Sequence, residues 1–129
     1  MAELSFFDKV ADRAGVPEET ARALTEATLR TLAERISGGE AAELADHVAH
    51  ELRPLLARAD AEEPQVFAYD EFVRRVAERA QVGPRLAEQG AGAVLQTLHR
   101  VVGHREFRQA LAQLPTEIQA LAEPVPHGP

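Results

Sequence analysis

The sequence of 129 residues contains no cysteine, and this absence excludes several classes of site. Without cysteine there is no disulfide framework, no thiolate zinc site and no cysteine nucleophile. No apolar run approaches the roughly 20 residues that a helix needs to cross a bilayer. The first ten residues carry acids and lack the basic start and apolar stretch of a secretory signal, so we expect a cytoplasmic location.

The sequence also has little lysine and few segments with the pattern of a β-strand. Lys9 is the only lysine, and the formal net charge is −7. This acidic balance favours solubility and opposes unassisted binding to phosphate backbones or to anionic membranes. No pair of strand-like segments joined by turn residues is visible, so we expect almost no β-sheet.

What the sequence does contain is an internal repeat. Shifted by 66 residues, it aligns with itself without a gap. The match predicts a tandem duplication within one domain, 1–129, with repeat one over 4–57, a linker over 58–68, repeat two over 69–122 and a flexible tail over 123–129. Identical pairs include Phe6 and Phe72, Val10 and Val76, Arg13 and Arg79, Ala21 and Ala87, Leu29 and Leu95, Thr31 and Thr97, and Leu32 and Leu98.

Each repeat has the periodicity of helices. Apolar residues at i, i+3, i+4 and i+7 predict a first helix over Phe7–Ala14 and again over Val73–Ala80. A long second helix follows, over about 17–36 and about 84–102. Proline cannot sit in a helix interior without losing a backbone hydrogen bond, so we expect a helix to end near Gln113 and a new one to begin at Pro115. In the first copy Pro54 comes later, and the third segment there either breaks similarly or stays continuous. The fold class is therefore all-α, a pseudo-two-fold bundle of about six to eight helices.

The two long helices should form the central layer of the core, around Leu24, Leu29, Leu32, Leu95, Leu98 and Val102. Gly90 and Gly92 lie inside the second long helix, where each costs about 1 kcal/mol relative to alanine. We expect another segment to pack closely over them; the alternative is a hinge. The aromatic residues are expected to anchor the core, the alternative being an exposed edge that recruits a partner: Phe6, Phe7, Phe67, Tyr69 and Phe72.

The pattern Phe-x3-Val-Ala-x-Arg-Ala, followed by a helix ending Leu-x2-Leu-x3-Ile/Val and then by Gln-Leu-Pro-x-Glu-Ile, resembles the family called domain of unknown function 2267. The resemblance covers about residues 4–122 and is clearest in YDEFVRRVAERAQV, 69–82, and AQLPTEIQALA, 112–122. The first copy departs from it, with Val48-Ala49 in place of Leu-Pro. The resemblance implies a helical bacterial or archaeal protein of unassigned biochemistry, and it carries over no catalytic residue.

Residues 6–40 are also similar to the opening helix pair of the HU family of DNA-bending proteins. In that family two such helices form the body of a dimer, and a basic β-arm grips DNA. Helical residues follow here where the arm should come. What is shared is the dimerising scaffold, and fold-level similarity does not transfer function. An HU-like nucleic-acid-associated protein is the first alternative.

Glu43, His47, His50 and Glu51 are the candidate metal ligands. On one helix, spacings of three and four residues would bring Glu43, His47 and either His50 or Glu51 near one face. Two imidazoles and a carboxylate can hold zinc or another divalent ion. The alternative is a solvated polar face. The second copy has no histidine at these positions, so no symmetric site is expected.

His99 and His104 flank the turn after the second long helix, where they can serve acid–base chemistry or interact with the helix-end dipole. No serine nucleophile, orienting aspartate or glycine-rich elbow accompanies them, so we expect no catalytic residue. Ser37-Gly38-Gly39 lacks the lysine of a phosphate-binding loop and is expected to cap a helix.

Six arginines of the second copy can converge on a basic patch: Arg74, Arg75, Arg79, Arg100, Arg105 and Arg108. Glutamates interleave with them, and the i, i+4 pairs Glu71–Arg75 and Arg74–Glu78 favour ordinary ion pairs.

These observations predict a non-enzymatic protein-interaction or regulatory module without a cofactor, whose partner is another protein or a second copy of the chain. A metal-binding protein acting through Glu43, His47 and His50 is the second alternative. The apolar positions repeat between the two copies, whereas the histidines do not. Any specific function is therefore expected where the copies differ.

Overall fold

The computed structural model describes residues 5–57 and 64–123, and within these ranges it contains eight α-helices, one 3-10 turn and no strand. The all-α prediction of six to eight helices is confirmed. No helix in the described ranges combines the length and the apolar character that crossing a membrane requires. In chain order the elements are α1 (Phe6–Ala14), α2 (Glu18–Arg35), α3 (Gly38–Asp46), η1 (His50–Leu52), α4 (Arg53–Leu56), α5 (Tyr69–Ala80), α6 (Pro84–Val102), α7 (His104–Leu111) and α8 (Thr116–Leu121).

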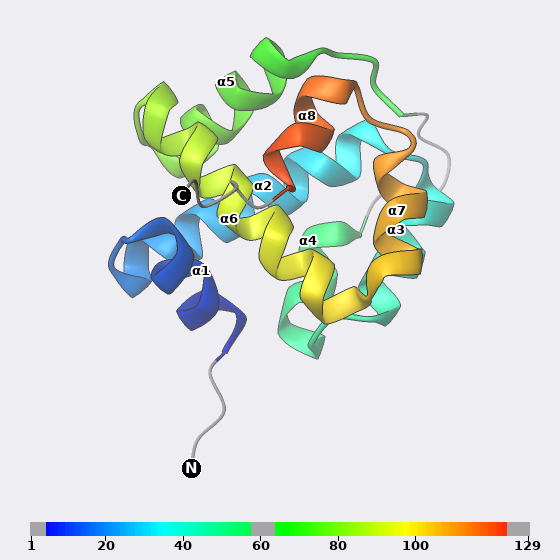
Figure 1. The fold of residues 1–129 in the computed structure, drawn as a ribbon, viewed down its shortest axis with the longest axis horizontal. Coiled ribbons are helices and arrows are strands. Elements are labelled where there is room, and N and C mark those ends of the chain that lie inside the picture. Colours follow the sequence, from blue (N-terminus) through cyan, green and yellow to red (C-terminus); the bar gives the residue numbers. More distant parts are fainter. Residues whose placement is uncertain (1–4, 58–63, 124–129) are drawn as a thin grey trace, which may run out of the picture.

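The long helices α2 and α6 cross in the middle of the molecule, with α1 and α5 toward one end and α3 and α7 side by side toward the other (Figure 1). Both α1 and α5 pack against both long helices. All six residues predicted for the central layer are buried, and the most exposed of them, Val102, is 6% exposed. The long helices therefore form the scaffold on which the other elements are placed.

The first helix of each repeat ends in the same way. Gly15 caps the end of α1 in the left-handed region with φ 67°, and Gln81 caps the end of α5 with φ 58°. The two positions are 66 residues apart. The next amide donates to the carbonyl oxygen five residues back in both copies, from Val16 to Ala11 and from Val82 to Ala77. The same turn is thus made once with glycine and once with glutamine.

The two halves also share their order of elements, a short helix, a long helix and then shorter pieces. The buried hydroxyl groups of Thr31 and Thr97 each donate to the carbonyl oxygen four residues earlier, at 2.7 and 2.8 Å. A duplication as the origin of this likeness, and the repeat boundaries, stay predictions. Residues 58–63 of the expected linker and 124–129 of the expected tail lie outside the described residues.

Both glycines inside α6 lie under closely packed neighbours, as the sequence indicated. A Cβ built on Gly90 would stand 2.6 Å from the Cδ atoms of Leu24, and one on Gly92 would stand 3.1 Å from the carbonyl oxygen of Leu121. Gly90 therefore lets α2 approach α6, and Gly92 lets α8 approach it from another side.

The aromatic residues are divided between core and edge. Phe6, Phe7 and Phe72 are buried, which fits their predicted role as core anchors. Phe67 is half-buried, and the guanidinium of Arg75 lies 4.1 Å from the centre of its ring. Tyr69 is half-buried at the start of α5, where its hydroxyl donates to a carboxylate oxygen of Glu88 on α6.

The third segment of each repeat is interrupted. α7 ends at Leu111 and α8 begins at Thr116, so the break lies within two residues of the predicted boundaries at Gln113 and Pro115. The first copy breaks as well: α3 ends at Asp46, and the 3-10 turn begins at His50. The continuous helix assumed for the metal candidates is therefore wrong.

Candidate binding groove along α6

A groove of about 840 Å³ runs along α6 from Arg85 to Gln96. The end of α1, the start of α5 and the residues from Glu117 to Glu123 bound it. Its apolar lining residues on α6 and α8 lie between polar lining residues along the chain: Gly92, Ala93, Ala120 and Leu121. Its charged residues carry both signs: Arg13, Arg85, Glu88, Glu117 and Glu123.

Hydrogen bonds between elements hold the walls of this groove. Gln89 on α6 donates through Nε2 to the carbonyl oxygen of Ala14 at 2.8 Å, which fixes the end of α1. Arg13 donates through Nη1 to Oε1 of Gln96 at 3.2 Å. Gln96 in turn donates through Nε2 to the carbonyl oxygens of Leu121 and Glu123, at 3.4 and 3.3 Å. Gln96 thus links α1 to the end of α8.

A second pocket, of about 390 Å³, adjoins the groove and shares Arg13 and Gln96 with it. It lies at the corner between α6 and α7. Its remaining lining residues are His99, Arg100, Gly103, His104 and Ala122, and none of the seven carries a carboxylate. Gly103 turns the chain at this corner with φ 92°, a conformation that favours glycine. The two arginines come from α1 and α6, and the two histidines come from α6 and α7.

The two histidines of this corner form a pair. His99 Nε2 and His104 Nδ1 lie 3.1 Å apart, and the His99 ring stacks on Phe107 at 4.5 Å with 8° between the ring planes. Burial lowers the pKa of His99 from its ordinary value, and the positive charges of His104, Arg100 and Arg108 lower it further. The sequence identified both residues, but their contact depends on the turn at Gly103.

The arginines divide into two groups. The predicted pairs Glu71–Arg75 and Arg74–Glu78 are present at 2.8 and 2.7 Å. Glu34 on α2 binds both Arg75 and Arg79 of α5, at 3.1 and 2.6 Å. By contrast, the structure records no ion pair within its described ranges for the three arginines nearer the end of the chain, Arg100, Arg105 and Arg108.

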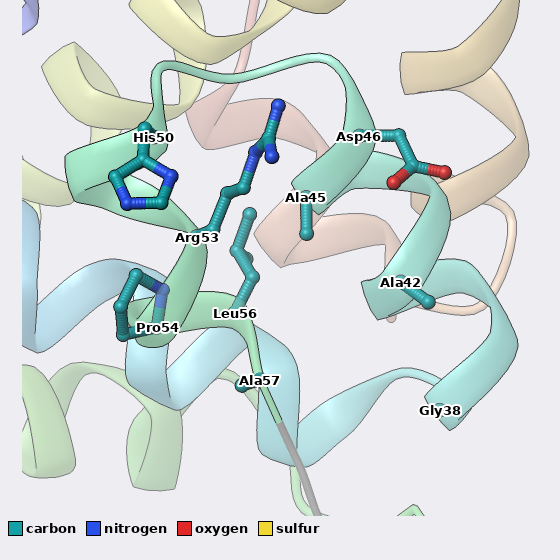
Figure 2. A pocket seen from close by; sticks show the side chains of 9 residues that line it. All are labelled: Gly38, Ala42, Ala45, Asp46, His50, Arg53, Pro54, Leu56 and Ala57. Atoms are coloured by element: carbon teal, nitrogen blue, oxygen red, sulfur yellow. The ribbon is translucent and has the colours of Figure 1, made fainter.

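A third pocket, of about 410 Å³, lies between α3 and the η1–α4 segment. Figure 2 shows Arg53 extending between these two segments, while the carboxylate of Asp46 points away from Arg53. His50 lines this pocket, but Glu43, His47 and Glu51 do not.

The structure does not bring the metal candidates onto one helix face. Glu43 lies within α3, His47 is the residue that ends this helix, and His50 and Glu51 belong to η1. All four side chains are exposed. Within residues 5–57 and 64–123 there is no group of three or more histidine, aspartate or glutamate side chains that could hold a metal ion.

Comparison of the sequence with known proteins shows its family. A family model described as an uncharacterized conserved protein, DUF2267, matches residues 4–121. The chain belongs to the DUF2267 family. No curated protein gives a significant match. Membership of DUF2267 confirms the resemblance stated from the sequence and assigns no biochemical activity. The similarity to HU proteins stays a prediction.

Sequence reasoning missed the groove in this DUF2267 protein, although the repeat carried a signal for it. At the offset of 66, Gly92 and Gln96 stand where the first copy has Glu26 and Arg30. A glycine and an amide on α6 thus replace two charged side chains on α2. The histidine pair likewise stands where the first copy has Ala33 and Gly38.

Proposed function

We propose that this protein is a non-enzymatic interaction module that binds a segment of another protein in the groove along α6. The observation that carries the proposal is the groove itself, about 840 Å³, lined by apolar residues of α6 and α8 and by charged residues of both signs. A protein interface usually combines apolar contacts with a polar rim.

The length of the groove suits a short segment. From Arg85 to Gln96 the helix rises by about 17 Å, at about 1.5 Å per residue. This distance accommodates about eleven residues of a helical segment, or about five residues of an extended one at about 3.3 Å each. Short segments of this kind dock in grooves through a few apolar side chains.

The charges around the groove set the chemistry of the partner. Arg13 and Arg85 make no ion pair with any residue that the structure describes, and the same holds for Glu117. A segment with apolar side chains against Ala120 and Leu121, which are exposed and half-buried, respectively, can therefore place an acidic residue toward an arginine and a basic residue toward Glu117. Such charge complementarity gives specificity and orientation more than raw affinity.

Panning a random peptide library, with peptides of about twelve residues, tests the proposal without knowledge of the natural partner. Ala120 is exposed on α8 and lines the groove, so Ala120→Trp fills the groove without entering the core. Ala42, exposed on α3 and outside the groove, gives the matched control Ala42→Trp. Peptides selected on the wild type should bind Ala42→Trp equally and Ala120→Trp at least about tenfold more weakly.

Equal binding to both tryptophan variants, or no enriched peptide, would overturn the proposal. A chain ending at Glu123 is panned in parallel, because residues 124–129 directly follow a lining residue of the groove. If only the shortened chain selects groove-binding peptides, residues 124–129 must occupy the groove in the full chain. That result would also contradict the proposal.

A further inference from the structure

The pocket at the corner of α6 and α7 collects positive charge in a protein whose formal net charge is −7. Arg13, Arg100 and the two histidines line it, and no carboxylate is among the lining residues that the structure describes. Neither Arg13 nor Arg100 forms an ion pair with the described part of the chain. Both arginine side chains are exposed and accessible to a ligand.

The corresponding place in the first copy has a carboxylate that this pocket lacks. At the offset of 66, Arg13 corresponds to Arg79 and Arg100 corresponds to Glu34. The carboxylate of Glu34 lies 2.6 Å from the guanidinium of Arg79 and neutralises it. A second arginine replaces this carboxylate beside Arg13. One substitution between the copies thus turns an internally neutralised cluster into one that lacks its counter-charge.

The histidine pair adds a hydrogen-bond donor to this pocket. His99 Nε2 and His104 Nδ1 share one hydrogen bond at 3.1 Å, so a neutral pair keeps one further ring N–H, whichever ring donates. The stack of His99 on Phe107 fixes the orientation of the pair. Burial lowers the pKa of His99, and the charges of His104, Arg100 and Arg108 lower it further.

We propose that this pocket binds a phosphoryl group, held by the guanidinium groups of Arg13 and Arg100 and by the outward N–H of the His99–His104 pair. A phosphoryl group offers three strongly accepting oxygens and close to two negative charges, enough for two guanidinium groups. A carboxylate can bridge two guanidinium groups, as Glu34 does with Arg75 and Arg79, but its single negative charge leaves such a pair with a net positive charge. This site lies beside the groove along α6 and does not depend on the proposed peptide binding.

The test follows the ring signals of the histidines by NMR while inorganic phosphate is added at constant ionic strength, with acetate as the matched anion. Phosphate should shift the signals of His99 and His104 saturably, and acetate at the same concentration should not. A parallel titration with phosphoserine distinguishes free phosphate from a phosphorylated side chain as the source. Tighter binding of phosphoserine assigns the pocket to phosphorylated protein, and equal or weaker binding assigns it to a small phosphate; either supports a phosphoryl site.

Two variants with the same change of charge distinguish specific binding in the pocket from attraction of phosphate to positive charge in general. Arg100→Glu restores the residue type of the corresponding position, Glu34, and should weaken phosphate binding by about tenfold or more. Arg105 is exposed on α7 but does not line the pocket, so Arg105→Glu should weaken binding by less than about threefold. Arg13→Gln provides a second loss within the site. Ala120→Trp, which fills the groove, should leave phosphate binding unchanged.

Several results would overturn the proposal. These are no saturable shift, equal shifts with acetate, or equal losses in Arg100→Glu and Arg105→Glu. A DNA duplex that shifts the same signals more strongly than phosphate, with affinity falling steeply as salt is added, would also overturn it. That outcome would assign the corner to a nucleic-acid backbone.

Discussion

The side chain of Leu24 on α2 occupies the space that a side chain at position 90 on α6 would need. Both Cδ atoms of Leu24 lie 2.6 Å from the place of a Cβ on Gly90. Leu24 is fully buried in the core, so a side chain at position 90 would force it to repack against its neighbours. The two positions are 66 residues apart, the offset at which the sequence aligns with itself. The long helices therefore meet at corresponding residues, one with a large side chain and one with none.

Gly90→Ala should destabilise the protein even though alanine is the better helix former. The helix-propensity gain is about 1 kcal/mol, whereas overpacking a filled core costs about 1–3 kcal/mol. We expect a net loss of about 1 kcal/mol, measured by urea unfolding. Gly39→Ala is the control, because a Cβ there meets nothing within 4 Å. In a Leu24→Ala background Gly90→Ala should become stabilising; an equal effect in both backgrounds would disprove the contact.

Thr28→Val should stabilise the protein by about 1 kcal/mol. The hydroxyl of Thr28 is buried and has no hydrogen-bond partner within residues 5–57 and 64–123, so removing it relieves a desolvation cost. The second copy has valine at the corresponding position, Val94, and that residue is fully buried. Thr25→Val is the control, since the Thr25 hydroxyl donates to the carbonyl oxygen of Ala21. Thermal unfolding that places Thr28→Val at or below the wild type would contradict this prediction.

Glu34 should contribute to stability above its ordinary pKa of 4.5 and lose that contribution in acid. Burial alone raises the pKa of Glu34, but the hydrogen bonds and charges of Arg79 and Arg75 outweigh burial and hold the pKa below that value. Because the folded state has the lower pKa, stability falls as the pH drops through 4.5 toward the folded value.

The measurement is the free energy of unfolding of Glu34→Gln between neutral pH and acid. At neutral pH the variant should lose about 1 kcal/mol, because the pairs join α2 to α5 but are partly exposed. Its stability should then change less than that of the wild type on acidification. Glu26→Gln, exposed on the same helix, is the control. If the acid dependence of Glu34→Gln matches that of the wild type, the role assigned to Glu34 is wrong.

His99 should titrate below its ordinary pKa of 6.5, because burial and then the charges of His104, Arg100 and Arg108 oppose its protonation. The unfolded chain then takes up the proton first, so stability decreases as the pH falls from 6.5 toward the folded pKa. NMR titration of the ring signals measures this pKa. Arg108→Gln should raise it, whereas Arg30→Gln, on the exposed face of α2, should not. A midpoint at or above 6.5 would contradict the geometry of the pair.

Much of the fold could be predicted from the sequence because it depends on local signals. α6 begins at Pro84 and ends before Gly103, as the proline and the glycine indicate. The break before Pro115 follows from the missing amide of proline. The break after Asp46 could not be predicted in this way, because the first copy has Val48-Ala49 in place of Leu114-Pro115.

The candidate sites were harder to predict because they depend on contacts between elements. Periodicity placed His47 and His50 on one helix, but the chain leaves the helix between them, so that prediction failed. Gln96 carries no motif, yet it joins three elements because α1 and α8 both reach α6 at that point. The exchange of Glu34 for Arg100 was readable from the repeat, but its meaning depends on the contact between Glu34 and Arg79.

The most direct test of the proposed function is the amide NMR spectrum of the labelled protein with one peptide selected on the groove. Two glycine amides report on the two places, Gly92 in the groove and Gly38 in the pocket beside α4. The proposal predicts the largest shifts at Gly92, Leu121 and the side-chain amide of Gln96, and none at Gly38. Largest shifts around Gly38, with Gly92 unchanged, would contradict it.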